Sequence, residues 1–312
     1  MVNLLSGNAL KTPVLFLVFN RPDTTKLVFE AIREAKPPRL YVASDGHRIT
    51  KEGEAERVHE VRAIATNVDW DCEIKTLFRD ENLGCKYAVS EAVSWFFQHE
   101  EQGIILEDDC LPSQSFFWFC EELLEKYKND LRVWHISGDN FQDGIKRGQG
   151  SYYFSKFNHI WGWATWANRW SKYDVEMNSY DTFLSNNLMY DLFELDQDKK
   201  YWSSIFEKAF KGEIDTWDYQ WTYTVWVNSG LSILPNINLV SNIGFGLNAT
   251  HTKELESQHS NMSRYDLCFP LTHPIFMVKD LDADKYTANR NFSKAKLLKK
   301  VFNKLKRELR LR

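Results

Sequence analysis

The chain has 312 residues, of which 43% are hydrophobic and 26% are charged, and its formal net charge is -4. This composition is too apolar for a disordered chain and provides core material for one large domain or two modest ones. Basic residues are concentrated in the last segment, residues 294–312. The body is therefore acidic, and it lacks the basic face expected of a nucleic-acid-binding protein.

The five cysteines are scattered along the chain. They form neither a C-x-x-C pair nor the compact spacing with histidine that zinc sites use, so the pattern indicates a reduced, cytosolic setting. The apolar run at residues 14–19 is too short to span a bilayer, and no signal peptide is predicted. In such a chain the N-x-S/T sequons at Asn248, Asn261 and Asn291 are expected to be chance matches.

The first half of the chain alternates between strand and helix patterns. Asp23 or Thr24 is placed to cap the first helix, and Pro112 with Ser113 marks the start of the fourth. Repetition of this kind predicts a mostly parallel, doubly wound α/β sheet. Strands are expected within residues 13–22, 39–47, 72–84 and 103–109, and helices within residues 23–36, 52–68, 85–100 and 113–128.

The second half differs in composition. From about residue 133 to 230 it is dense in tryptophan and tyrosine, and the strand-helix alternation does not continue. No linker rich in glycine, serine or proline divides it off, so it is predicted to be a mixed extension on the same sheet. Four of its aromatic side chains could form platforms for sugar rings, although core packing is the favoured role. These are Trp161, Trp163, Trp166 and Trp170.

Three consecutive carboxylates, Glu107, Asp108 and Asp109, end the fourth predicted strand. In doubly wound sheets, ligands bind outside the carboxyl ends of the strands, where Arg21 and Asp45 are also expected. Because neighbouring buried carboxylates repel one another, a cation is expected to meet them. Hard oxygen ligands suit Mg²⁺ or Mn²⁺. The alternative is a solvated acidic loop, or acids that favour a helix N-terminus.

Further candidate residues have two interpretations each. Asp45 either binds a ribose or base group or begins an Asp-Gly turn, which the sequence favours. Arg21 either pairs with a phosphate or nucleobase or is an ordinary exposed arginine. Asp215 and Asp218, among aromatic residues, are suited to a general base or to a helix cap. His251, in a glycine-containing segment, either meets a metal or oxyanion or is an isolated surface histidine.

The C-terminal segment has the pattern of a basic amphipathic helix. Attraction to anionic lipid, on the order of 1 kcal/mol per basic residue, predicts a peripheral membrane anchor. A nucleic-acid arm and a partner-binding helix are the alternatives. The apolar stripe consists of Leu297, Leu298, Val301, Phe302, Leu305 and Leu309.

Residues 11 to about 260 resemble nucleotide-diphospho-sugar glycosyltransferases of the GT-A fold. The similar segments follow one another in the expected order: FLVFNRP, SDGH, ENLGCKYAVSEAVSWFF, GIILEDDCLPSQSFFWF, HISGDN, GWATWANRW, WDYQW and NIGFG with ATHT. The motif EDDCLP followed by paired phenylalanines is the most specific of them. It is similar to the metal motif of the N-acetylglucosaminyltransferases that initiate complex N-glycans. The resemblance implies a Rossmann-like, mostly parallel sheet with an acceptor-side extension.

For the donor, the resemblance implies that Asp109 binds Mn²⁺ or Mg²⁺ and that Glu107 and Asp108 contact the sugar nucleotide. It also implies that Arg21 and Asp45 line the uridine pocket. The expected donor is a UDP-sugar.

For the acceptor, the resemblance implies that Asp218 is the catalytic base and that His251 lies near the diphosphate. Its relatives have two adjacent aspartates where this chain has Asp218 followed by Tyr219, so Asp215 stays an alternative base. The expected acceptor is a glycan or a lipid-linked saccharide.

The hypothesis that follows is a metal-dependent, inverting glycosyltransferase of a bacterial surface-glycan system. Its expected location is cytoplasmic and peripheral, on the inner face of the membrane. Residues 1–285 are expected to form one domain, with a nucleotide-sugar half at about 11–140 and an acceptor half at 141–285, followed by the basic tail at 286–312. The alternatives are a metal-dependent nucleotidyltransferase or phosphoesterase, and a non-catalytic scaffold that binds sugar nucleotides.

Overall fold

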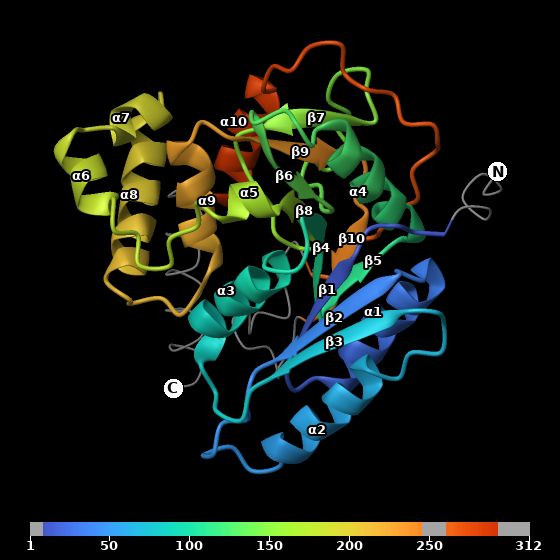
Figure 1. Ribbon diagram of the computed structural model, residues 1–312. Coiled ribbons are helices and arrows are strands. Elements are labelled where there is room, and N and C mark those ends of the chain that lie inside the picture. The colour runs from blue at the N-terminus through green and yellow to red at the C-terminus, as the bar shows by residue number, and fades with distance from the viewer. Residues whose placement is uncertain (1–8, 245–259, 293–312) are drawn as a thin grey trace, which may run out of the picture.

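The structure is a computed structural model that describes residues 9–244 and 260–292 (Figure 1). Its strands are β1 (Val14–Val18), β2 (Arg39–Ser44), β3 (Glu73–Phe78), β4 (Gln102–Glu107), β5 (Cys110–Pro112), β6 (Val133–Ser137), β7 (Tyr152–Ser155), β8 (Trp163–Trp166), β9 (Leu231–Pro235) and β10 (Val240–Asn242). Its helices are α1 (Pro22–Ala35), α2 (Glu54–Ala65), α3 (Gly84–Phe97), α4 (Gln114–Lys126), α5 (Ala167–Trp170), α6 (Tyr180–Ser185), α7 (Met189–Leu192), α8 (Asp196–Phe210), α9 (Asp218–Val227) and α10 (Leu281–Asn291).

The described strands form an eight-stranded sheet in the order β3-β2-β1-β4-β8-β6-β9-β7, and β10 pairs with β5 in a small second sheet. The first four strands of that order run parallel. β8 is antiparallel to both of its neighbours, and β7 is antiparallel at the edge. The predicted α/β class with a mostly parallel sheet is therefore confirmed, and the second half of the chain extends the same sheet as expected.

Helices cover both faces of the sheet, because β1, β2 and β4 are buried on both sides. In β1, Phe16 contributes to one core with side chains of α1, α2 and α4. Leu15 and Leu17 contribute to the other, with side chains of α3, α8 and α9. Figure 1 shows α1 and α2 on one side of β1–β3 and α3 on the other, with α6 to α9 gathered beyond the sheet.

The second core is built largely from aromatic rings. Trp163 stacks on Trp217 with a centroid distance of 5.3 Å, and Trp170 stacks on Tyr173 at 4.3 Å. Trp163, Trp166 and Trp170 are at most 4% exposed, so they serve the core, while Trp161 is partly buried. Core packing, the favoured interpretation of the tryptophans, holds for these three.

The start of α1 differs from the prediction. The helix begins at Pro22 with Arg21 as its N-cap residue, and no side chain caps it. Asp23 and Thr24 already lie inside the first turn, because proline is preorganised for the first helical position. Instead of capping, the Thr24 hydroxyl donates a hydrogen bond to the Arg21 carbonyl.

Within the described ranges, no helix has the length and apolarity needed to cross a membrane. All five cysteines are free. The expected start of the basic tail, residue 286, falls inside α10, and the rest of the tail from residue 293 lies outside the described residues.

Candidate functional site

Side chains from four strands meet at one edge of the sheet. Since β1, β2 and β4 are parallel, Arg21, Asp45 and the acidic residues 107–109 follow strand ends at this edge. β6 also runs parallel to β4, because β8 is antiparallel to both, so Asp139 follows a strand end there too. The sequence analysis predicted that all of these residues except Asp139 lie at this edge. This edge is where α/β sheets bind ligands.

Arg21 is the cation that meets the acidic triplet. Its guanidinium forms an ion pair with Asp108, and its Nη1 lies 2.7 Å from Oδ2 of Asp109. The backbone N–H of Phe19 donates to the other oxygen of Asp108 at 3.0 Å. Burial opposes the charge of Arg21, but Asp108 and Asp109 outweigh it and raise the Arg21 pKa. Arg21 therefore stays charged and holds both aspartate side chains in place.

Glu107 is the last residue of β4 and directly precedes the paired Asp108 and Asp109. Burial and the charge of Asp109 raise the pKa of Glu107 to about 8, although Arg21 lowers it. The charge of Asp218 makes a smaller contribution to the same increase. Asp215, three residues before Asp218, bonds to the start of α3, as does Asp45 at the sheet edge. Asp218 begins α9 and accepts a hydrogen bond from the Thr216 hydroxyl. The structure thus brings this predicted base to the edge where the triplet lies.

Asp45 and Asp215 both bind the start of α3. Asp45 accepts hydrogen bonds from the N–H groups of Leu83 and Gly84, the latter at 3.1 Å. Asp215 accepts from Cys85 at 3.1 Å and from Lys86 at 2.8 Å. These contacts give Asp45 and Asp215 a helix-capping function in the structure.

Cys85 is a site residue that the sequence analysis missed. Burial, followed by the charges of Glu107, Asp218 and Asp215, raises the pKa of its thiol. The thiol therefore lies among the predicted carboxylates. A single cysteine in a helical pattern carries no signal of such a position.

Asp139 was also missed, although the segment that contains it had been noted. It is 1% exposed, and the backbone N–H of Trp161 donates to its carboxylate. Burial raises the pKa of Asp139 well above its ordinary value. The available signal was an acidic residue directly after a buried strand, as at Asp45.

Gly244 allows the chain after β10 to approach the ion pair. The N–H of Ile243 donates to the carbonyl of Asp109 at 2.8 Å. A Cβ atom on Gly244 would lie 2.1 Å from Oδ2 of Asp109 and 2.5 Å from Nη1 of Arg21. Any residue other than glycine at this position would therefore displace the side chains of Asp109 and Arg21. His251, predicted to lie in the loop that follows, is outside the described residues.

The described residues contain no group of three or more His, Cys, Asp or Glu side chains arranged around a metal position. Two carboxylates, those of Asp108 and Asp109, pair with a single guanidinium, and the charge of that guanidinium also lowers the pKa of Glu107. Among the described residues, Oδ1 of Asp109 meets only the weakly donating thiol of Cys110, at 3.5 Å. Mg²⁺-type sites commonly use one or two carboxylates together with substrate phosphates. The donor set of Asp109 and Glu107 therefore fits a divalent cation that arrives with a diphosphate.

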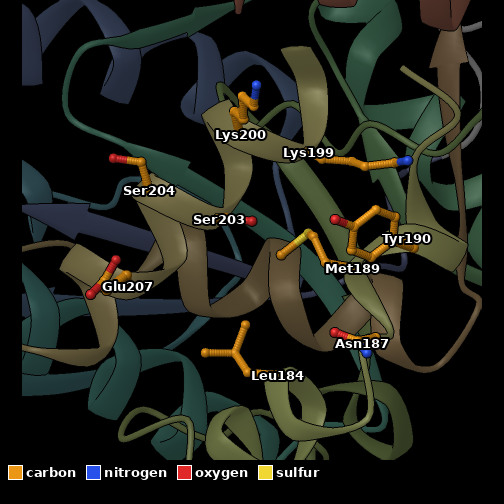
Figure 2. Close-up of a pocket in the computed structure, with 9 residues that line it drawn as sticks. All are labelled: Leu184, Asn187, Met189, Tyr190, Lys199, Lys200, Ser203, Ser204 and Glu207. Atoms are coloured by element: carbon orange, nitrogen blue, oxygen red, sulfur yellow. The ribbon is translucent and has the colours of Figure 1, made fainter. Parts of the chain in front are cut away.

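A separate surface pocket of about 400 Å³ lies among α6, α7 and α8, and none of the predicted site residues lines it (Figure 2). Lys199 extends over the ring of Tyr190, with Nζ 4.4 Å from the ring centroid. This pocket is distinct from the carboxylate cluster at the sheet edge.

Comparisons with known proteins give similarity in structure only. No family model and no curated protein matches this chain. A UDP-glucose pyrophosphorylase complexed with UDP-glucose aligns over 52% of this chain and 78% of its own, with 10% identity and a TM-score of 0.30. A galactosyltransferase in complex with donor and acceptor sugar analogues aligns over 59% and 66%, with 14% identity and a TM-score of 0.33. The 4-diphosphocytidyl-2C-methyl-D-erythritol synthase of Anaerococcus prevotii aligns over 65% and 84%, with 8% identity and a TM-score of 0.32. These values assign no activity to the chain.

Proposed function

We propose that this protein is a glycosyltransferase that moves a sugar, with inversion, from a UDP-sugar to a hydroxyl group of a glycan or lipid-linked saccharide. The observation that supports the proposal is the gathering of Arg21, Asp108 and Asp109 at the carboxyl edge of the parallel strands, close to the segment that contains Asp215 and Asp218. In this proposal the edge binds a cation together with a diphosphate, and a neighbouring carboxylate accepts a proton.

For the donor, we assign Asp109, with Glu107 beside it, to a divalent cation, Mn²⁺ or Mg²⁺. When bound, such an ion neutralises negative charge on the departing diphosphate. Arg21 holds Asp108 and Asp109 in place, and Asp45 fixes the start of α3 at the nucleotide pocket. His251, beyond Gly244, is assigned to the surroundings of the diphosphate on the grounds of resemblance.

For the acceptor, Asp218 is favoured over Asp215 as the base. Both oxygens of Asp215 accept backbone N–H groups of α3, whereas Asp218 lies near Glu107. Asp218 would take the proton of the acceptor hydroxyl while that oxygen bonds to the anomeric carbon and the bond to UDP breaks. A single displacement of this kind inverts the anomeric centre and needs no covalent enzyme intermediate.

Calorimetric titration of UDP tests the donor site. We expect binding with Mn²⁺ and little binding with EDTA, and we expect Asp109→Asn to weaken it at least tenfold. Asp143→Asn is the matched control, because Asp143 pairs with Arg290 away from the site. Absence of UDP binding by the unchanged protein would refute the donor assignment.

Product analysis then tests the reaction. Asp218→Asn should keep UDP affinity and reduce sugar transfer by about 10² to 10⁴, the usual contribution of a general base. Release of phosphate or pyrophosphate in place of sugar transfer would identify a phosphoesterase or nucleotidyltransferase. Unchanged cellular glycans in both the Asp218→Asn and the Asp215→Asn strain would favour a scaffold.

We also propose that the basic segment at residues 294–312 attaches the protein to the anionic inner face of the cytoplasmic membrane. This assignment rests on the spacing of its apolar and basic residues, because the segment lies outside the described residues.

A further inference from the structure

A buried glutamate joins the two loops that follow β1 and β2. Glu54, the first residue of α2, is 1% exposed. Its Oε1 accepts a hydrogen bond from Nδ2 of Asn20 at 2.7 Å, and its Oε2 accepts one from the backbone N–H of Arg48 at 2.7 Å. Because β1, β2 and β4 are parallel, both loops lie at the edge where the acidic triplet ends β4. Glu54 therefore ties together two loops of the candidate site.

The side chain of Arg48 completes the contacts of Glu54. Its Nε lies 3.0 Å from Oε2 of Glu54, and its Nη2 donates to Oε1. A contact through two nitrogens fixes the plane of the guanidinium. Burial opposes the charge of Glu54, but hydrogen bonds from Arg48 and Asn20 outweigh it and lower the pKa of Glu54 to about 2. The carboxylate is therefore charged at neutral pH and holds Arg48 in one orientation.

The guanidinium of Arg48 also lies against the loop that contains the ion pair of the site. Its central carbon is 5.4 Å from the centroid of the Phe19 ring, which is within the range of a cation–π contact. The backbone N–H of Phe19 donates to Asp108 at 3.0 Å, and Arg21 pairs with the same aspartate. Direct contacts through Arg48 and Phe19 therefore join Glu54 to the acidic triplet.

Arg48 keeps hydrogen-bonding capacity for a ligand. Its contact with Glu54 uses Nε and Nη2, and within residues 9–244 and 260–292 no protein group accepts a hydrogen bond from its Nη1. The side chain is 38% exposed, so a ligand can reach it. Arg21 differs, because both of its terminal nitrogens bind aspartates. Arg48 is therefore able to donate hydrogen bonds to a group that binds at this edge.

The position of Arg48 indicates which part of a donor it meets. Arg48 follows β2, and β1 alone separates β2 from β4 in the sheet. Neighbouring strands are about 4.8 Å apart, so the ends of β2 and β4 are about 10 Å apart. A nucleoside diphosphate can span this distance. If its diphosphate lies at the end of β4, its base can lie at the end of β2.

We propose that Arg48 donates hydrogen bonds to the uracil ring of the donor and that Glu54 is the positioning residue that orients Arg48 for this contact. The inference rests on the proposed transferase function and deepens it, because it assigns recognition of the base to named residues. Uracil has carbonyl oxygens that accept hydrogen bonds, and the free N–H groups of a guanidinium match them. Glu54 is buried and acts through Arg48 alone.

Calorimetric titration of Glu54→Gln tests the positioning role. Glutamine keeps the size of the side chain but removes the charge that pairs with Arg48. We expect the affinities for UMP and UDP, measured with Mg²⁺, to fall by about tenfold, as expected for the weakening of a charge-assisted hydrogen bond. The affinity for inorganic pyrophosphate should not change, since this ligand has no base. An equal loss of affinity for pyrophosphate would overturn the assignment to the base.

Glu100→Gln is the matched control, because Glu100 forms the same kind of pair at the other end of β2. Its side chain is 10% exposed and accepts hydrogen bonds from Nε of Arg39 at 2.5 Å, from Nη2 of Arg39 at 2.9 Å and from the Tyr41 hydroxyl at 2.8 Å. Both glutamine variants should melt at a lower temperature than the unchanged protein. Only Glu54→Gln should bind UMP more weakly. Equal UMP affinities in the two folded variants would mean that Glu54 serves stability alone, and would overturn the proposal.

A double variant tests whether Glu54 acts through Arg48. Arg48→Met keeps an apolar stem over Phe19 and removes the donors, so it should weaken UMP binding at least as much as Glu54→Gln does. Arg48→Met combined with Glu54→Gln should bind UMP no more weakly than Arg48→Met alone. The double variant contains no unpaired buried charge at this position, so it guards against misfolding of the single variant.

The outcomes separate this inference from the proposed function. Normal UMP affinity in Arg48→Met, or additive losses in the double variant, would overturn this inference alone. An unchanged protein that binds no UDP would overturn the proposed function.

Discussion

Asp45 and Asp215 cap the same helix. Asp45, which follows β2, accepts the N–H groups of Leu83 and Gly84, and Asp215, which precedes α9, accepts those of Cys85 and Lys86. The donors are the N-cap residue Leu83 and the first three residues of α3, whose amides have no partners inside the helix. The two halves of the chain therefore meet at this helix start, beside the acidic triplet.

The cap predicts a stability effect for Asp215. Asp215→Ala removes the acceptor of two backbone N–H groups and a negative charge at a helix N-terminus, so it should lower the free energy of unfolding by about 0.5 to 2 kcal/mol. Urea denaturation measures this. Asp181→Ala, an acidic residue in the first turn of α6 with no capping contact, serves as the control. Unchanged stability together with lost transfer would make Asp215 the base.

Gly244 should be required for donor binding. Gly244→Ala places a methyl group within 2.1 Å of Oδ2 of Asp109 and must separate Asp109 from Arg21. We expect UDP affinity to fall at least tenfold in calorimetric titration. Gly212→Ala is the control, since a Cβ there meets no atom within 4 Å and costs only the strain of a φ of 69°. Equal UDP affinity in both variants would contradict the assigned role of the ion pair.

His135 should make the fold sensitive to acid. Burial lowers its pKa from the ordinary 6.5 to about 4 in the folded protein. Between these two values the unfolded chain binds a proton that the folded chain does not, so stability falls as the pH falls. The loss should approach about 3 kcal/mol by pH 4.

Nε2 of His135 lies 2.7 Å from the carbonyl oxygen of His159. Comparison with His135→Gln isolates the titration, because glutamine keeps a donor for this carbonyl but does not titrate. The difference in unfolding free energy between the two proteins should shrink from pH 7 to pH 4.5 in urea titrations. A difference that is constant over this range would show that His135 titrates normally.

The tail predicts charge-dependent membrane binding. Removal of residues 294–312 should release the protein from vesicles that contain phosphatidylglycerol, because the segment contains nine basic residues and one acidic residue. Co-sedimentation measures binding, and neutral phosphatidylcholine vesicles are the control. Transfer to a soluble acceptor should persist. If the full and shortened chains bound these vesicles equally, the anchor hypothesis would be refuted.

The sequence by itself determined the strand-helix alternation and the position of the acidic triplet. Both depend on local patterns: continuous apolar runs mark strands buried on two faces, and polar residues mark the ends of those runs. The parallel order of β1, β2 and β4 then brings Arg21, Asp45 and Asp109 to one edge. This much of the candidate site was predictable without coordinates.

Only the tertiary structure decided the partners of these side chains. Arg21 pairs with Asp108 and Asp109, Asp215 caps α3, and Trp221 donates a hydrogen bond to His135. Each of these facts joins segments that are distant in the chain, and local pattern contains no information on such contacts. The start of α1 was misjudged for a smaller reason, since Pro22 alone is sufficient to begin the helix. The chain thus encodes its elements locally, whereas the packing of the second half against the first defines the chemistry of the site.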